Sequence, residues 1–303
     1  MNQRQKDFDF VCVGGATQDV FVSSDASKVM TLSDIREERQ LLCFDYGGKL
    51  TVDHIEFTTG GGATNTAVSL ARLGARSAFV GKTGTDRIGR LVLEELGEYG
   101  VDTSYGLVSE ARPTGYSVIL TSFEGDRTVL VHRGANEEMK ADEIDWSFID
   151  RTGWLYVTSL SGGSAELLGP LAERAVAAGL DIAFNPGSTQ LEAGLDGLGD
   201  ILRATTVLLL NKEEAARLSG KPPVKDVIIE SRCDLCGKCI EVCPAGVFVE
   251  HHGRIALGIE LCDQCGRCLP ACPNNAIAME PWTFNVTEAF DALTAAGPDV
   301  VVI

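Results

Sequence analysis

The sequence is poor in basic residues and has no long apolar run. Its 26 lysine and arginine residues face 43 aspartates and glutamates, which gives a formal net charge of −17 at pH 7. Such an excess of negative charge disfavours nucleic acid, whose phosphates require clustered basic side chains, and it disfavours an anionic membrane surface. We therefore expect neither of these partners. No apolar run approaches the roughly 18 residues of a membrane-spanning helix.

Histidine is also scarce. The four histidines, His54, His132, His251 and His252, have no mutual spacing typical of a metal site, so we expect them to be structural or solvent-exposed. The first residues, MNQRQKDFDF, lack the apolar core of a signal peptide, which favours a cytoplasmic protein. With 45% hydrophobic residues, the chain can form one large domain and a small one.

Cysteine is nearly absent from most of the chain but dense in one segment. Of the ten cysteines, only Cys12 and Cys43 lie outside this segment. Disulfide scaffolds distribute their cysteines through a small secreted chain, so this clustering favours metal binding. The other eight form two runs of the pattern C-x-x-C-x-x-C-x-x-x-C-P, displaced by 29 residues, within the repeated stretches CDLCGKC and CDQCGRC. This repetition indicates an internal duplication.

The cysteine segment resembles the bacterial-type ferredoxins that carry two clusters, and the resemblance covers its full length. In such modules the fourth cysteine of each run ligates the other cluster. The resemblance therefore implies two [4Fe–4S] clusters, with low-potential one-electron transfer to a redox partner protein. One cluster would be held by Cys233, Cys236, Cys239 and Cys272, and the second by Cys262, Cys265, Cys268 and Cys243. Zinc sites instead favour two separated C-x-x-C pairs around one ion.

The rest of the chain alternates strand-like and helix-like patterns. FDFVCVGG reads as a strand that ends in a glycine turn, and ATNTAVSLARLG reads as an amphipathic helix. TGYSVILTS and RTVLVHRG read as a hairpin pair, and the less regular segment from about 41 to 57 predicts a small accessory sheet. The alternation is typical of βαβ units, so it predicts an α/β fold with a doubly wound, mostly parallel sheet.

The alternation stops after SGKPPVKD and resumes at VTEAFDALTAAGPDVVVI. We therefore predict that residues 1–226 form the first part of the large domain and that residues 286–303 resume it with a helix and a strand. Residues 227–285 are predicted to be a small α+β ferredoxin-like insertion. A surface loop is where such an addition costs least.

Several stretches of the large domain resemble the ribokinase family, also called PfkB-type carbohydrate kinases. These stretches are VGGATQDVFV, TGGGATNTAVSLARLG, FVGKTGTDRIGR, RPTGYSVILTSFEGDRTVLVHRGAN, NPGS and LLLNKEEAARLSG. The resemblance covers roughly residues 8–226 and resumes at 286. It implies a ribokinase-like fold and ATP-dependent phosphorylation of a sugar or nucleoside hydroxyl, assisted by Mg²⁺.

The same resemblance implies which residues bind the ligands. The sugar or nucleoside would contact Asp19, Gly61, Gly62, Asn65 and Asn136, and the nucleotide and Mg²⁺ would contact Asn185, Asn211 and Glu214. Some of these positions also have a structural interpretation. Asp19 can be a turn residue, and Gly61 and Gly62 can form a glycine-rich helix start. Glu214 can be a solvated acid in the first turn of a helix, where the helix dipole favours it.

One motif of the family is missing from these 303 residues. The family's catalytic base is an aspartate in a motif like D-T-x-G-A-G-D, whose helix start also forms the anion hole. The nearest string here is TAAGPD, at Asp299. Phosphoryl transfer needs a positioned base and an anion hole, so we expect no appreciable kinase activity and a C-terminally truncated kinase fold. A fragment or chimera and a natural fusion that uses the kinase fold as a scaffold both stay open.

Three functional hypotheses follow. The first is an iron–sulfur protein for electron transfer, carried on an inactive kinase scaffold. The second is a working carbohydrate or nucleoside kinase with a regulatory or decorative insertion. The third is a sugar-binding module whose affinity responds to the redox state of the clusters. By analogy with the family, we also expect a homodimer formed through the lid sheet.

Overall fold

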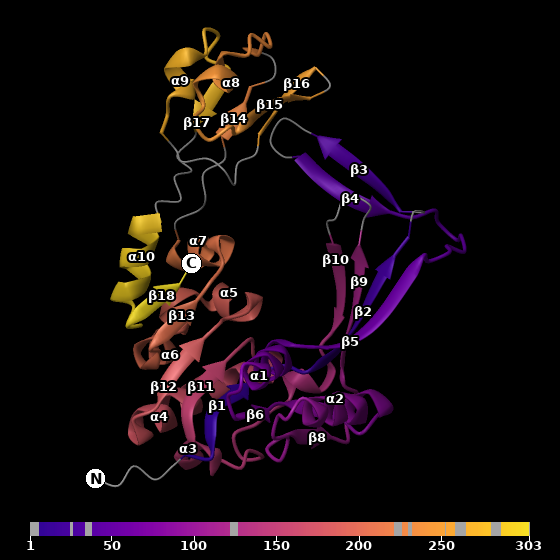
Figure 1. Ribbon diagram of the computed structural model, residues 1–303, viewed down its shortest axis with the longest axis vertical. Coiled ribbons are helices and arrows are strands. Elements are labelled where there is room, and N and C mark those ends of the chain that lie inside the picture. The colour runs from indigo at the N-terminus through magenta and orange to yellow at the C-terminus, as the bar shows by residue number, and fades with distance from the viewer. Residues whose placement is uncertain are drawn as a thin grey trace. The chain divides into compact units, whose positions relative to one another are not determined.

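The computed structural model describes residues 6–24, 27–33, 38–121, 127–220, 226–229, 232–251, 253–257, 265–279 and 286–302 (Figure 1). The chain forms two compact units. The first, called here the sheet unit, comprises Met1–Leu209 and Ala296–Val302. The second, the cysteine unit, comprises Leu210–Ala295. Each unit is described separately below.

A six-stranded parallel sheet forms the centre of the sheet unit, with the strand order β18-β13-β12-β11-β1-β6. Its strands are β1 (Phe8–Val13), β6 (Ser77–Val80), β11 (Thr152–Val157), β12 (Asp181–Phe184), β13 (Val207–Leu209) and β18 (Val300–Val302). All neighbours pair in parallel, which confirms the predicted α/β class and its mostly parallel sheet. Because β18 pairs with β13, residues on both sides of the cysteine segment belong to one sheet.

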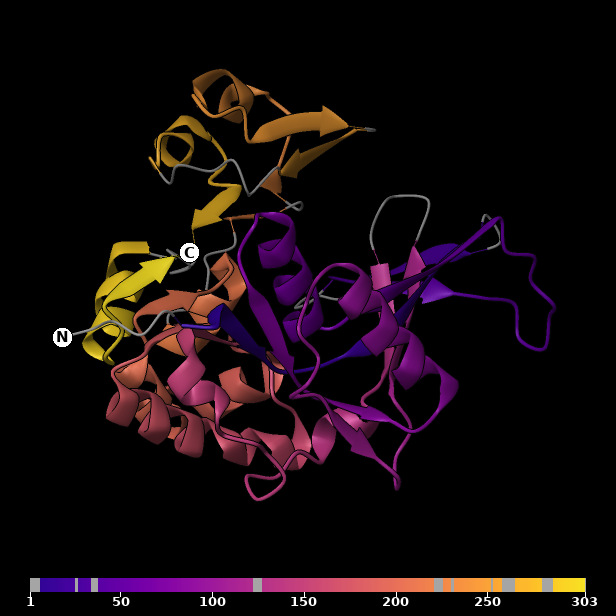
Figure 2. The ribbon, with the colours of Figure 1, turned by 60° about the horizontal axis from the view of Figure 1, so that its bottom comes forward.

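Helices connect these strands (Figure 2). They are α1 (Gly62–Arg72), α2 (Arg87–Glu98), α3 (Phe148–Arg151), α4 (Leu168–Ala178), α5 (Ser188–Gly197) and α6 (Gly199–Ala204), with 3-10 turns at Gly134–Glu137 and Gly162–Leu167. Helix α4 ends where Gly179 adopts a left-handed conformation, which glycine tolerates best. No helix within the described ranges is both long enough and apolar enough to cross a membrane.

One cluster of the core of this unit lies between the sheet and the two helices α1 and α2. Its buried members are Cys12, Ala16, Ala63, Ala67, Phe79, Val92, Leu96 and Val101. Ala63 and Ala67 are one helical turn apart, so both face the sheet. Burial raises the pKa of the Cys12 thiol to about 12, so Cys12 is an inert core residue.

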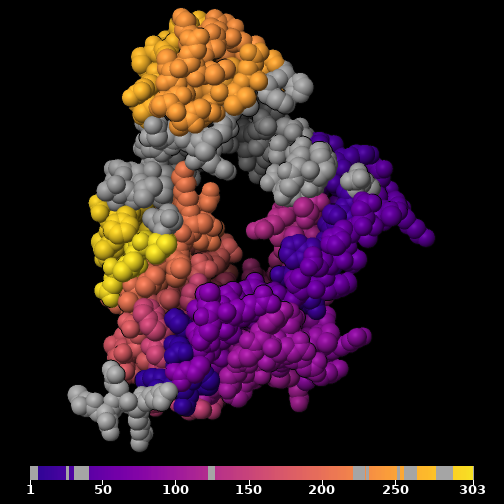
Figure 3. Space-filling view, viewed as in Figure 1, coloured from indigo at the N-terminus to yellow at the C-terminus, as the bar shows by residue number. Residues whose placement is uncertain are grey.

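A second, four-stranded sheet has the order β10-β9-β2-β5. Its strands are β2 (Thr17–Ser23), β5 (His54–Gly60), β9 (Gly115–Thr121) and β10 (Arg127–His132). The predicted hairpin is confirmed as the antiparallel pair β9–β10. The accessory sheet expected within residues 41–57 is larger than predicted, because β2 pairs with both β5 and the distant β9. Strands of this sheet form part of the unit's surface (Figure 3).

Two smaller strand pairs complete the sheet unit. Strands β3 (Lys28–Ser33) and β4 (Glu38–Cys43) form an antiparallel hairpin, and β7 (Lys82–Gly84) pairs in parallel with β8 (Leu107–Ser109). Phe57 on β5 and Leu130 on β10 are more than half exposed, with relative exposures of 61% and 56%. The four-stranded sheet therefore carries apolar side chains at its surface.

The cysteine unit contains helices α7 (Lys212–Ser219) and α10 (Val286–Ala295), which lie against each other. Between them in sequence are β14 (Asp226–Ile228), α8 (Lys238–Val242), β15 (Phe248–His251), β16 (Arg254–Leu257), α9 (Cys268–Ala271) and β17 (Ile277–Met279). Strand β14 pairs with β17, and β15 pairs with β16, both antiparallel.

The strand pairing of this unit reflects the sequence duplication. A shift of 29 residues carries β15 onto β17 and the pairing Ile228–Ile277 onto the pairing Leu257–Phe248. Each two-stranded sheet therefore combines the first strand of one repeat with the last strand of the other. The two repeats are related by an approximate two-fold arrangement and are joined by exchanged strands.

Candidate functional site

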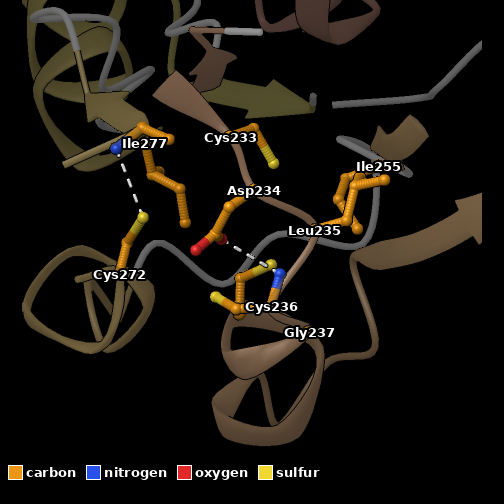
Figure 4. A pocket seen from close by; sticks show the side chains of 10 residues that line it. Cys233, Asp234, Leu235, Cys236, Gly237, Ile255, Cys272 and Ile277 are labelled. Carbon is orange, nitrogen blue, oxygen red and sulfur yellow. Dashed lines mark hydrogen bonds between the residues drawn. The ribbon is translucent and has the colours of Figure 1, made fainter. Parts of the chain in front are cut away.

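One cavity in the cysteine unit is lined by cysteines from both repeats. Cys233, Cys236 and Cys239 come from the first repeat and Cys272 comes from the second (Figure 4). The remaining lining residues are Asp234, Leu235, Gly237, Ile255, Ala276 and Ile277. These four cysteines are the set that the sequence predicts for one cluster.

Strand pairing explains why the fourth cysteine comes from the other repeat. Cys233 lies just after β14, and Cys272 lies just before β17. Antiparallel pairing of these strands brings the two chain ends together, and the Ile229 N–H extends the pairing by donating to the Ala276 carbonyl at 2.7 Å. The exchanged strands therefore deliver Cys272 to the loop that carries the other three cysteines.

The first cysteine loop turns sharply. Leu235 has φ 60° and Gly237 has φ 72°, both in the left-handed region. Gly237 is the N-cap residue just before α8. A methyl group there would meet no atom within 4 Å, so the backbone angle alone favours glycine. Its counterpart Gly266 has φ 68°. These turns let the chain bend around the cavity between successive cysteines.

The fourth cysteine of each repeat accepts a backbone hydrogen bond. The Val247 N–H donates to Cys243 Sγ at 3.4 Å. The Ala276 N–H donates to Cys272 Sγ at 3.2 Å, the bond drawn in Figure 4. Such bonds stabilise negative charge on a metal-bound thiolate and tune cluster potentials. The two bonds occupy equivalent positions, so the duplication extends to the environment of the sulfur atoms.

An apolar cluster supports both cysteine loops. It contains the buried residues Cys239, Val247, Phe248, Cys268 and Ile277. Burial raises the pKa of the Cys239 thiol. By contrast, Cys236 and Cys265 are exposed. In each repeat, therefore, the second cysteine of the motif lies at the surface and the third lies in the apolar interior.

The second cysteine set is described in part. Cys268 is buried, Cys243 is half-buried and Cys265 is exposed, while Cys262 lies outside the described residues. Among the side chains that the structure describes, no three cysteine, histidine or acidic groups converge on the volume of a single ion, as a mononuclear zinc site would require. The donor set of the first cavity, four thiols on two loops, fits a [4Fe–4S] cluster.

In the sheet unit, the structure places Asp19 beside the glycine turn that begins α1. Asp19 lies on β2, and its Oδ1 accepts from the Thr17 hydroxyl at 2.9 Å. A methyl group on Gly60 would lie 1.9 Å from Asp19 Oδ2. Gly61 has φ 106°, and a methyl group there would lie 2.3 Å from the Gly15 carbonyl oxygen. Glycine is therefore required where β5, α1 and the turn after β1 meet.

Gly62 and Asn65 occupy the first turn of α1. A methyl group on Gly62 would lie 2.7 Å from Thr158 Oγ1, so Gly62 also marks a close approach. Asn65 is exposed and lines a groove of about 320 Å³ between β5, α1 and α2. Thr58 lines the same groove and stands opposite Asp19 in the β2–β5 pairing. Thr58 therefore connects the groove that Asn65 lines to Asp19, the predicted sugar-binding aspartate on the neighbouring strand.

Asn136 has a structural role that the sequence does not reveal. It is buried, its Oδ1 accepts from the Ala16 N–H at 2.9 Å, and its Nδ2 donates to the Ala16 carbonyl at 2.8 Å. Both bonds join positions 120 residues apart. Asn136 therefore fixes the turn that leads from β1 to Asp19, and its role as a sugar ligand stays a prediction.

The predicted nucleotide residues also contact backbone groups. Asn185, after β12, donates from Nδ2 to the Leu209 carbonyl at 2.9 Å. In the cysteine unit, the Glu214 N–H donates to Asn211 Oδ1 at 2.8 Å, and the Asn211 N–H donates to Glu214 Oε2 at 2.9 Å. This reciprocal pair is a capping box at the start of α7. Magnesium binding by Asn211 and Glu214 stays a prediction.

Two further contacts of charged side chains in the sheet unit are not specified by the sequence motifs. Burial would raise the pKa of Asp86, but hydrogen bonds from the N–H groups of Thr114 and Gly89 hold it below its ordinary value. Asp86 thereby joins the start of α2 to the start of β9. The buried Lys82 Nζ contacts both Glu143 oxygens, at 2.8 and 2.9 Å, so this lysine of the GKTG stretch is in an ion pair.

Comparison with known proteins identifies both parts of the chain. Residues 24–233 match the model of the pfkB family carbohydrate kinases. The chain belongs to this family. Residues 232–277 match the model of the 4Fe-4S dicluster domain. In the sequence of this PfkB-type chain, the dicluster domain thus lies between β13 and β18, which are neighbouring strands of the six-stranded sheet.

Several of its relatives are named as kinases of sugars or sugar phosphates. An uncharacterized sugar kinase of Archaeoglobus fulgidus is 32% identical over 153 residues, which cover 50% of this chain and 60% of that protein. An ATP-dependent ribose-1-phosphate kinase of Halopiger xanaduensis is 32% identical over 159 residues, 52% of each chain. The structure of Arabidopsis thaliana ribokinase complexed with ribose and ATP matches with a TM-score of 0.55 and 24% identity, over 70% of this chain and 63% of that one. The PfkB-type chain thus spans about half to two thirds of the length of these relatives.

Proposed function

We propose that the cysteine unit binds two [4Fe–4S] clusters and transfers single electrons at low potential. The observation that supports this proposal is the cavity whose four cysteines come from both repeats. Cys233, Cys236, Cys239 and Cys272 would hold one cluster. By the duplication, Cys262, Cys265, Cys268 and Cys243 would hold the other.

The bound clusters would supply the redox chemistry, because each can accept and release one electron. The chain's own residues hold and tune them. The N–H groups of Val247 and Ala276 stabilise the negative charge of the two fourth ligands. The exposed Cys236 and Cys265 would place one edge of each cluster near the surface, where a redox partner protein can approach. Since the chain is strongly acidic, a basic partner surface is favoured.

For the sheet unit we propose a ligand-binding scaffold for a sugar or nucleoside. Asp19, Gly61, Gly62, Asn65 and Asn136 would contact this ligand. If ATP also binds, Asn185 of this unit would contact it. Asn211 and Glu214 belong to the cysteine unit, where Mg²⁺ binding is their predicted role. The names of the relatives, a sugar kinase and a ribose-1-phosphate kinase, favour a sugar or sugar phosphate. We expect no appreciable phosphoryl transfer by these 303 residues, since they contain no D-T-x-G-A-G-D motif.

Anaerobic purification followed by iron and sulfide analysis tests the electron-transfer proposal. We expect a brown protein with about eight irons and about eight sulfides per chain. A colourless protein that stays colourless after reconstitution with iron and sulfide would refute it. We also propose a cytoplasmic location, because cysteines stay reduced there and are free to bind a metal cluster.

Kinase activity is the second candidate function, favoured by the family membership. A panel of sugars, sugar phosphates and nucleosides with ATP and Mg²⁺ tests it. Turnover that Asp19→Ala abolishes would support the kinase and overturn the scaffold proposal, whereas no turnover on the whole panel would exclude kinase activity of this chain.

The four-stranded sheet supports a proposal for assembly. Phe57 and Leu130 expose apolar surface that a second copy of the chain could cover. We propose a homodimer formed through this sheet. Light scattering of the purified chain should give twice the chain mass, and Phe57→Lys should return the monomer mass.

A further inference from the structure

One leucine forms part of the boundary between the first cavity and solvent. Leu235 lines the cavity together with Ile255 and Ile277, and Figure 4 shows Leu235 and Ile255 on the side away from Cys272. Ile277 is buried, whereas Leu235 has a relative exposure of 37%. A side chain that lines a cavity and also contacts solvent separates the two. Leu235 therefore covers part of the opening of the cavity.

The backbone at this position favours glycine rather than leucine. Leu235 has φ 60°, and residues with a Cβ rarely adopt this left-handed region. Of the residues that the structure describes, Asn275 is the only other non-glycine residue with positive φ, and asparagine tolerates this conformation better than leucine does. Leucine therefore raises the energy of this turn relative to glycine, and what it adds is an apolar side chain at the cavity.

We propose that Leu235 shields the first cluster from water and thereby lowers its reduction potential. This inference rests on the proposed binding of clusters by the cysteine unit. Reduction adds one negative charge to a cluster, and nearby water stabilises that charge. An apolar side chain that excludes water makes the reduced state less favourable, so the potential becomes more negative.

Electrochemistry of the cluster-loaded protein tests this inference. The full chain is reconstituted anaerobically, and its reduction potentials are measured by voltammetry. Leu235→Gly should make one of the two potentials less negative by about 30–60 mV, which corresponds to about three- to tenfold in the equilibrium constant of a one-electron couple. Glycine suits the left-handed backbone at this position, so the loop should keep its shape and the iron content should stay the same.

Pulsed electron paramagnetic resonance provides an independent measure of water access. The reduced protein is transferred into heavy water, and the coupling between the unpaired electron spin and solvent deuterons is recorded. Leu235→Gly should increase this coupling, because water can approach the cluster more closely without the leucine. Leu235→Met keeps an apolar side chain of similar size, so both the coupling and the potential should match those of the unaltered protein.

A matched control is available on β15. Val249 is an exposed apolar residue of the same unit, with a relative exposure of 55%, and it is not among the residues that line the cavity. Val249→Ala should change neither the potentials nor the deuteron coupling. Unchanged values in Leu235→Gly, or an equal shift in Val249→Ala, would overturn the inference alone. A protein that binds no iron after reconstitution would instead refute the proposed function, and this inference with it.

Discussion

The cysteine unit and the sheet unit hold their candidate functional residues in different ways. In the cysteine unit, four thiols from two loops face one cavity, and backbone groups donate to the sulfur atoms. In the sheet unit, Asn136 and Asn185 use their amides to bind backbone carbonyls and N–H groups. The cysteine loops therefore present four ligands of one chemical type to a single cavity. In the kinase-like stretches, by contrast, residues predicted to bind a ligand also make hydrogen bonds that hold the fold, as Asn136 and Asn185 do. The sequence motif alone does not distinguish a ligand-binding residue from a structural one.

The largest expected effect concerns a single cluster. Cys272→Ala should reduce the iron content from about eight to about four per chain, because Cys272 is the fourth ligand of one proposed site only. Iron analysis and visible absorption after anaerobic reconstitution measure this change. Cys43→Ala, which alters a half-buried cysteine on β4, is the control and should keep the full iron content. Complete loss of iron in Cys272→Ala would show that the sites are not separate.

The next effect concerns stability of the sheet unit. Gly61→Ala should lower its free energy of unfolding by about 2–4 kcal/mol, since a methyl group would lie 2.3 Å from the Gly15 oxygen at φ 106°. Gly74→Ala is the control, because Gly74 has φ 92° but no atom within 4 Å, and it should cost only about 1 kcal/mol. Urea denaturation followed by tryptophan fluorescence compares them. Equal losses would mean that backbone angle, rather than close approach, explains Gly61.

Acid should weaken the sheet unit through Asp86. Its pKa is held below the ordinary value of 3.8, so its contribution to stability is fully present above that value and is lost as pH falls through the lower pKa of the folded state. Asp86→Asn should therefore be less stable than the unaltered protein at neutral pH, and the difference should shrink below about pH 4. Denaturation curves at several pH values give this difference. A gap that stays constant with pH would contradict the assignment.

The smallest effect separates capping from metal binding at Glu214. Glu214→Ala should destabilise α7 by about 0.5–1 kcal/mol through loss of the capping box. Glu214→Gln keeps a side-chain acceptor for the Asn211 N–H and should recover most of this loss. Thermal unfolding with and without Mg²⁺ provides the measurement. Stabilisation by Mg²⁺ in the unaltered protein that both variants abolish would instead favour a metal role.

Much of the fold can be predicted from the sequence, because local patterns encode it. Strand–helix alternation predicts the parallel sheet, and the 29-residue displacement from Cys233 to Cys262 predicts the duplicated module. The roles of individual side chains are harder to predict. Asn136 binds Ala16 across 120 residues, a distance at which no sequence pattern specifies a partner. The N-x-x-E string did carry a usable signal, since this spacing is also that of a capping box.

The exchanged strands of the cysteine unit have a consequence for how such a module could arise. A chain with one repeat would contain the first strand of one two-stranded sheet and the last strand of the other, and it could pair neither strand within itself. Two copies of that chain could complete both sheets, and each cluster site would then lie at an interface between subunits. Joining the copies in one chain removes the concentration dependence of that assembly. It also lets each half diverge, as the different residues at the equivalent positions Ala245 and Asn274 illustrate.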